Sequence, residues 1–187
     1  KSVLEKDGTI HSAGDTVLGA DDISGILEIL YGVQLVLDSG KPHKKIEILF
    51  TIGEELYVKG SDVFDYSKVT AKQAYVLDLS EETTFNIGTI QGGTATNIVP
   101  DCCVLTAYET TLESKSVTDF QKACEILGFS GGLTGTFGGS DNNSFAKNGI
   151  EGLVLSNGMY NAHSTREYTT VDDLYKGAEL IGQLILL

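Results

Sequence analysis

Residues 16–55 decide the fold, and they read TVLGADDISGILEILYGVQLVLDSGKPHKKIEILFTIGEE. The stretch begins with a short apolar run, 16–20, that leads into the paired carboxylates Asp21-Asp22. Residues 23–38 carry apolar side chains at helical spacing and are followed by the helix-stopping sequence SGKP. Residues 46–52 form a short apolar run rich in β-branched side chains, which predicts a strand covered on both faces. This order of elements predicts a βαβ unit.

Two further apolar runs extend the pattern. Residues 74–79 resemble the run at 46–52, and residues 152–156 lead through a polar loop to His163. Parallel strands need long crossover connections, and a helix such as 23–38 provides one. The sequence therefore predicts an α/β fold around a mostly parallel sheet.

The chain changes character after residue 84. Two stretches rich in Gly and Thr, 85–93 and 101–111, predict two strands of a hairpin or meander. Three more helices are predicted from their capping and stopping residues: Ser116–Asp119 to Gly128, Asp141 to Lys147, and Thr170 to the end of the chain.

Composition limits the function classes. The 187 residues carry a formal net charge of −13, which argues against nucleic acid and anionic membrane surfaces as partners. No apolar run approaches the roughly 20 residues of a membrane-spanning helix, so no membrane partner is expected. Three cysteines without a CxxC pair fit a reduced, cytoplasmic protein better than a disulfide framework. Any metal here must then be held by oxygen and nitrogen atoms.

Acidic side chains and one histidine follow the predicted strands. Ligands of open α/β sheets bind at the carboxyl ends of the strands, so these groups are expected to converge there around a metal pair. Each group alone has an ordinary explanation: Asp21-Asp22 as a helix N-cap, Glu54-Glu55 as the start of a solvated loop, and His163 as a surface residue. Their shared position after strands of one sheet favours the metal site.

The chemistry of a metal pair needs these residue types. Two divalent ions need a bridging carboxylate, and Asp21 is short enough for that role at a strand-to-helix turn. A second carboxylate that is not a ligand can take a proton from water. The adjacent acids Glu54 and Glu55 can supply both a ligand and such a base.

At this point the sequence resembles the M20 family of zinc-dependent metallopeptidases, closest to its tripeptidase T-like branch. The matching stretches occur in the family's order and span most of the chain. They are Leu18–Asp22, Phe50–Glu55, Asn86–Gly93, Thr96–Asp101, Gly138–Asp141, and Asn161–His163 with Glu167.

The resemblance implies roles for individual residues. Asp21 is expected to bridge two zinc ions, or cobalt or manganese in their place, and Glu55 and His163 to bind one of the two ions. Asp78 is expected to bind the other ion, and Glu54 to act as the general base. The resemblance also implies a cis peptide bond between Asp21 and Asp22. Asn97 is expected to contact substrate, whereas His11 and His43 match no family ligand.

The resemblance also implies the architecture. Residues 1–84 and 123–187 are expected to form a three-layer α/β/α catalytic domain of the zinc-exopeptidase type. Residues 85–122 are expected to be the remnant of a small α+β, ferredoxin-like lid through which the family forms homodimers. The sequence departs from the family in three ways: no His-x-Asp motif occurs, few residues separate Asp78 from Asn86, and the lid arginine is absent. We therefore expect the sequence to be part of a longer chain.

The expected function is that of a metal-dependent exopeptidase, an aminopeptidase that hydrolyses di- and tripeptides. Two alternatives stay open. One is an amidohydrolase for N-acyl amino acids with the same metals, and the other is a non-catalytic relative that binds a peptide or amino acid. The glycine-rich region 131–139 lacks the Lys-Ser/Thr of a phosphate-binding loop, and no GxSxG elbow of a serine hydrolase occurs.

Overall fold

The computed structural model describes residues 1–79, 91–92, 103–104, 113–134 and 139–187. At its centre, β3 (Gln73–Leu79) and β6 (Glu151–Ser156) pair in parallel, with Gln73 opposite Glu151 and Leu77 opposite Leu155. The predicted strands at 74–79 and 152–156 are thereby confirmed. The register shifts between Leu77 and Leu79, so the irregularity falls at Asp78.

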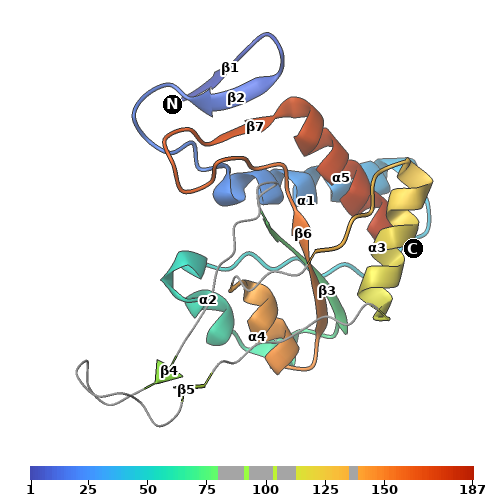
Figure 1. Cartoon of the computed structure of the whole chain (residues 1–187). Coiled ribbons are helices and arrows are strands. Elements are labelled where there is room, and N and C mark those ends of the chain that lie inside the picture. Colours follow the sequence, from blue (N-terminus) through green and yellow to red (C-terminus); the bar gives the residue numbers. More distant parts are fainter. Residues whose placement is uncertain (80–90, 93–102, 105–112, 135–138) are drawn as a thin grey trace.

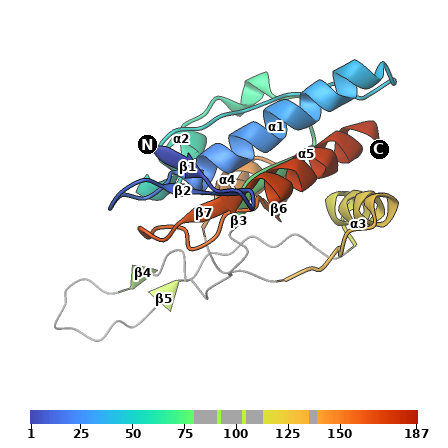
Figure 2. The same ribbon diagram turned by 90° about the horizontal axis from the view of Figure 1, so that it is seen from above.

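Helices cover both faces of this strand pair (Figure 1). On one side α1 (Ala20–Ser39) and α5 (Val171–Leu186) lie side by side, as Figure 2 shows from above, and α3 (Lys115–Leu127) packs next to α5. On the other side α4 (Asp141–Lys147) contacts both strands. The core joins side chains of the strands to those of α3 and α5: Leu77, Leu155, Ala123, Ile181 and Leu184.

A second, antiparallel sheet has the order β1 (Ser2–Leu4), β2 (Thr9–Ser12), β7 (Tyr168–Thr170). It ties the N-terminal strands to the segment that follows His163. The remaining elements are short: η1 (Glu54–Leu56), α2 (Lys59–Asp62), η2 (Tyr66–Lys68), and the antiparallel pair β4 (Gln91–Gly92) with β5 (Cys103–Val104). That last pair falls within the two strands predicted at 85–93 and 101–111.

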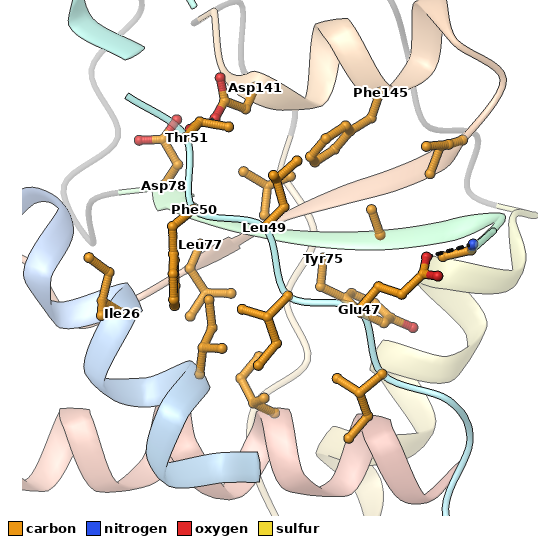
Figure 3. A pocket seen from close by; sticks show the side chains of 18 of the residues that line it. Ile26, Glu47, Leu49, Phe50, Thr51, Tyr75, Leu77, Asp78, Asp141 and Phe145 are labelled. Carbon is orange, nitrogen blue, oxygen red and sulfur yellow. Dashed lines mark hydrogen bonds between the residues drawn. The ribbon is translucent and has the colours of Figure 1, made fainter. Parts of the chain in front are cut away.

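Two predicted strands are wrong. Residues 16–20 form bends and irregular backbone up to the start of α1. The strand that precedes them, β2, ends at Ser12. Residues 46–52 form no strand, although their apolar pattern favours one. A cavity of about 670 Å³ lies between this segment and β3 (Figure 3). In the part of the chain that the structure describes, β3 pairs with β6 alone, so residues 46–52 do not join its hydrogen-bond ladder.

The predicted helices form, with corrections at two starts. The helix predicted at Ser116–Asp119 begins at Lys115, because the Ser114 hydroxyl accepts a hydrogen bond from the Val117 N–H, 3.2 Å away. Gly128 ends it in a left-handed conformation, as predicted. Ser140, not Asp141, caps the helix that ends at Lys147.

The other two helix starts agree with the sequence. Thr170 caps α5 through the Asp173 N–H, 3.0 Å away. The Asp22 carboxylate accepts a hydrogen bond from the Gly25 N–H at 3.2 Å. Asp22 therefore acts as the predicted N-cap of the helix that continues from residue 23.

The division into a catalytic domain and a lid stays a prediction. Most of residues 85–112 lie outside the described part of the chain. Helix α3 crosses the predicted boundary at residue 122 without a break and contacts β3, β6 and α5. Among the residues that the model describes, no helix is long and apolar enough to cross a membrane.

Candidate metal centre

Three side chains from distant parts of the sequence converge at one end of the strand pair. His163 Nε2 lies 2.9 Å from an Asp21 carboxylate oxygen and 3.0 Å from a Glu55 carboxylate oxygen. One ligand atom from each of these three residues falls within 4.8 Å of the others. The structure therefore brings together Asp21, Glu55 and His163, which the sequence placed in one metal site.

The turn before α1 presents Asp21. Gly19 has φ 83°, a left-handed conformation that glycine adopts without steric cost. Asp21 and Asp22 then depart from helical dihedral angles before the regular helix begins, and the peptide bond between them is cis, as expected. The Asp21 side chain contacts His163 and is only 19% exposed.

The acidic pair Glu54-Glu55 lies on the short helix η1, directly after residues 46–52. Gly53, with φ 69°, lets the chain turn sharply, so that the Leu56 N–H bonds back to the Gly53 carbonyl at 3.2 Å. Because η1 is a single tight turn, consecutive side chains point in different directions. Glu55 extends to His163, and Glu54 is half-buried beside the acids of the strand ends.

His163 lies in the loop between β6 and β7. Two residues of this loop have left-handed backbone, Asn161 with φ 50° and His163 itself with φ 64°. The Ser164 hydroxyl donates to the Asn161 carbonyl at 2.8 Å, and Tyr160 and Tyr168 are joined by paired backbone hydrogen bonds of 2.9 and 3.1 Å. These contacts close the loop at its base, so His163 projects from a fixed turn.

Glu54 has the electrostatic environment of a proton acceptor. Burial, followed by the negative charges of Glu55, Asp141 and Asp21, raises the pKa of Glu54 to about 7, whereas His163 acts to lower it. A carboxylate whose pKa lies near neutrality both accepts and returns protons efficiently. The Glu54 carbonyl accepts from the Val58 N–H at 2.7 Å, whereas no side-chain hydrogen bond is among the influences on the pKa of its carboxylate.

Asp78 and Asp22 lie deeper than Glu54. Burial, followed by the charges of Glu54, Asp21, Asp22 and Asp141, raises the pKa of Asp78 to about 8. Burial is also the largest cause that raises the pKa of Asp22 to about 7, with the Asp21 charge acting in the same direction. Asp78 is therefore part of the acidic cluster, although it does not belong to the group of three converging ligands.

The donor set fits a divalent cation. Two carboxylates and an imidazole are the oxygen and nitrogen ligands that zinc, cobalt and manganese accept. Among the described residues, Asp21 and Glu55 each form an ion pair with His163, a group that is cationic only when protonated. A cation among these carboxylates would relieve the repulsion that raises the pKa values of Glu54 and Asp78.

The acidic cluster lines one end of the cavity between residues 46–52 and β3 (Figure 3). Asp78 and Asp141 lie at this end, and Thr51 donates a hydrogen bond to Asp141. The middle of the lining is apolar and comes from β3 and the helices on both faces, including Ile26, Leu77 and Phe145, whereas the opposite end is polar and includes Glu47.

Three polar residues of the site were missed by sequence reasoning or received another role. Asp141, interpreted as a helix cap, is a buried acid that contributes to the field on Glu54 and Asp78. Asn157 is buried, and its amide donates to Asp22 and to the Ser24 hydroxyl. Glu167 is buried with its carboxylate against the turn before Asp21. Nothing in their local sequence indicates these contacts, which join segments far apart in the chain.

Other predicted residues lie outside the site. Asn97 falls outside the described residues, so its predicted contact with substrate stays a prediction. His11 bonds to Glu5 at 2.9 Å and His43 to the backbone of Lys44 at 2.8 Å, which agrees with the interpretation that neither is a ligand.

Comparison with known proteins identifies relatives of this chain. The whole chain, residues 1–187, matches the family model described as peptidase family M20/M25/M40. The uncharacterized protein YqjE of Bacillus subtilis is 24% identical in a match that extends over 281 residues with its gaps and covers 99% of this chain and 76% of that protein. Peptidase T of Vibrio cholerae is 32% identical over 119 residues, which cover 63% of this chain and 28% of that protein.

Two solved structures share the fold. The aminopeptidase PepT from Bacillus cereus and a tripeptidase from Staphylococcus aureus each match with a TM-score of 0.82, at 23% and 20% identity. Each match covers 99% of this chain and 75% of the other chain. The α/β fold of the catalytic domain and the resemblance to the tripeptidase T-like branch are thereby confirmed. Because the family model spans all 187 residues, the chain belongs to the peptidase family M20/M25/M40.

Proposed function

We propose that this chain is a metal-dependent exopeptidase that removes residues from the free N-terminus of di- and tripeptides. The observation that carries the proposal is the convergence of Asp21, Glu55 and His163, with the proton acceptor Glu54 next to them. A family of peptidases supplies the reaction class, and this cluster supplies the chemical groups that hydrolysis of a peptide bond needs.

Asp21, Glu55 and His163 would hold one zinc, cobalt or manganese ion, and Asp78 together with Asp21 would hold a second. When bound, such an ion polarises the scissile carbonyl and lowers the pKa of a water molecule. Glu54 takes the proton of the attacking water and passes it to the leaving amine. In the metal-free chain, burial and neighbouring acids raise the pKa of Glu54 to about 7. A bound cation would lower this pKa, so Glu54 would be ionised and able to accept the proton near neutral pH.

The substrate class rests on relatives. Peptidase T, the aminopeptidase PepT and the tripeptidase are named for action on peptides, and this chain shares their fold or part of their sequence. Two alternatives keep the same residues: an amidohydrolase for N-acyl amino acids, and a binding protein without catalysis. Both would retain the acidic cluster, so activity has to decide between them.

A direct assay separates the three functions. The chain is loaded with Zn²⁺, Co²⁺ or Mn²⁺ and incubated with trialanine, dialanine or N-acetylalanine, and the products are measured by mass spectrometry. We expect alanine to be released from the peptides and not from N-acetylalanine. Release only from N-acetylalanine would establish the amidohydrolase, and metal binding without any hydrolysis would establish the binding protein. Chain treated with a chelator is the control.

Two further expectations remain proposals. Homodimer formation would involve the predicted lid, residues 85–122, of which the structure describes residues 91–92, 103–104 and 113–122, and light scattering of the purified chain tests it. A cytoplasmic location accords with the reduced cysteine pattern, and Cys124 is a free, buried thiol.

A further inference from the structure

A buried carboxylate joins the two loops that carry the metal ligands. Glu167 is 2% exposed, which is rare for an acidic side chain unless its oxygen atoms are bonded. One oxygen accepts from the Gly19 N–H at 2.7 Å, and the other accepts from the Asp21 N–H at 2.9 Å. Glu167 and these two residues are 148 and 146 positions apart in the sequence.

The two N–H groups belong to the turn that presents Asp21. These groups precede the regular helix, which continues from residue 23, and a backbone N–H group that is shielded from water needs an acceptor. Gly19 precedes α1 and has no side chain, so it cannot form a capping hydrogen bond of its own. The Glu167 carboxylate, from a distant part of the chain, is the acceptor for both N–H groups. One of them belongs to Asp21, whose side chain is a proposed metal ligand.

Glu167 also belongs to the loop of His163. The Glu167 N–H donates to the Ser164 carbonyl at 3.1 Å, and the next residue, Tyr168, pairs with Tyr160 to close the loop. A displacement of Glu167 would therefore move both the turn that carries Asp21 and the loop that carries His163. The side chains of these two residues lie 2.9 Å apart.

We propose that Glu167 is a positioning residue for the metal centre. Its carboxylate holds the Gly19–Asp21 turn close to the His163 loop, so that the side chains of Asp21 and His163 can reach one cation. Glu167 itself is not a ligand, because its two oxygen atoms are taken by backbone N–H groups. This inference rests on the proposed metal-dependent function.

The substitution Glu167→Gln tests the proposal because it keeps the shape of the side chain and removes one of the two acceptors. The amide NH₂ group then faces a backbone N–H instead of accepting from it. We expect the affinity for Zn²⁺, measured by isothermal titration calorimetry, to fall by about 10–100-fold, the usual effect of losing a partner that orients metal ligands. Glu125→Gln is the matched control, because Glu125 is exposed on α3 away from the site.

The absorption spectrum of bound Co²⁺ provides a readout that general destabilisation does not change. A shift of its d–d bands in Glu167→Gln reports altered ligand geometry, whereas a loss of folded protein lowers only the intensity. We expect Glu167→Asp, which retains both acceptors on a shorter side chain, to recover part of the affinity. Wild-type affinity and an unchanged cobalt spectrum in Glu167→Gln would overturn the proposal.

Amide hydrogen exchange of the wild-type chain tests the contact even if the variants fail to fold. We expect the Gly19 and Asp21 amides, observed by NMR without metal, to exchange slowly, as hydrogen-bonded amides do. Exchange at the rate of free amides would overturn the Glu167 contact. If the wild-type chain binds no metal while these amides are protected, the proposed function fails and the contact stands.

Discussion

His163 Nε2 and an Asp21 carboxylate oxygen lie 2.9 Å apart although 142 positions separate the two residues in the sequence. Glu55 meets the same nitrogen at 3.0 Å, so the imidazole stands between two carboxylates from different loops. A divalent cation can replace a proton between such groups, because carboxylate and neutral imidazole are both metal ligands.

Removal of the imidazole tests this ligand set. We expect His163→Ala to weaken Zn²⁺ binding by more than the about 10–100-fold that the loss of an outer partner causes, because a direct ligand is lost. Calorimetry at constant pH measures the change. His43→Ala is the control, since His43 is exposed and bonds only to the backbone of Lys44 among the contacts described. Equal affinities of His163→Ala and wild type would exclude His163 as a ligand.

Glu54 and Glu55 are adjacent but should respond differently to substitution. We expect Glu54→Gln to lower kcat for a tripeptide by about 10²–10⁴-fold while metal affinity stays close to wild type, because it removes only a proton acceptor. Glu55→Gln should instead lower metal affinity, because Glu55 contacts His163. Steady-state kinetics and calorimetry on both variants separate the roles. An unchanged kcat in Glu54→Gln would show that the general base is another residue.

The stability of the metal-free chain should fall as the pH rises. Asp78 has its pKa raised by burial from 3.8 to about 8, so at intermediate pH the folded chain binds a proton that the unfolded chain releases. Unfolding then releases this proton, and the free energy of unfolding decreases from about pH 4 until the folded-state pKa is passed. Asp22, with its pKa raised to about 7 by burial, acts in the same direction.

Thermal melts in a chelator between about pH 5 and pH 8 measure this effect. We expect a smaller decrease of Tm with pH in Asp78→Asn, which cannot ionise, and a smaller decrease in wild type when Zn²⁺ is added. If Asp78→Asn showed the same pH dependence as wild type, Asp78 would not carry the raised pKa.

The contact between α1 and α5 depends on a small residue. A Cβ atom at Gly32 would lie 2.7 Å from the Ala178 carbonyl oxygen and 2.9 Å from Ile181 Cβ on α5. We expect Gly32→Ala to lower the free energy of unfolding by about 1–3 kcal/mol through overpacking, although alanine favours the helix. Urea denaturation measures the change. Gly14→Ala is the control, because a Cβ atom there meets nothing within 4 Å; a Gly32→Ala variant as stable as this control would contradict the close packing.

Local sequence was sufficient where a segment's own pattern decides its structure. The apolar spacing of residues 23–38 produces the regular part of α1, and the apolar runs at 74–79 and 152–156 produce β3 and β6. Asp78 and His163 could also be placed, because β3 and β6 are parallel and bring their carboxyl ends to one edge of the sheet. Asp21 and Glu55 meet His163 there although the strands predicted before them do not form. The resemblance to a family added the roles of Asp21, Glu54 and Glu55.

Tertiary structure decided what depends on a partner from elsewhere in the chain. The run at 46–52 has the composition of a strand, but a strand requires a neighbouring backbone, and a cavity lies there instead. The Glu167 carboxylate reaches Gly19 and Asp21 only because β7 returns the chain to the start of α1. Likewise, the raised pKa values of Glu54 and Asp78 come from burial and from acids on other segments. Sequence thus determined the proposed ligands and the proposed base, and folding determined the buried groups around them, their distances and their pKa values, because these depend on contacts that no local pattern encodes.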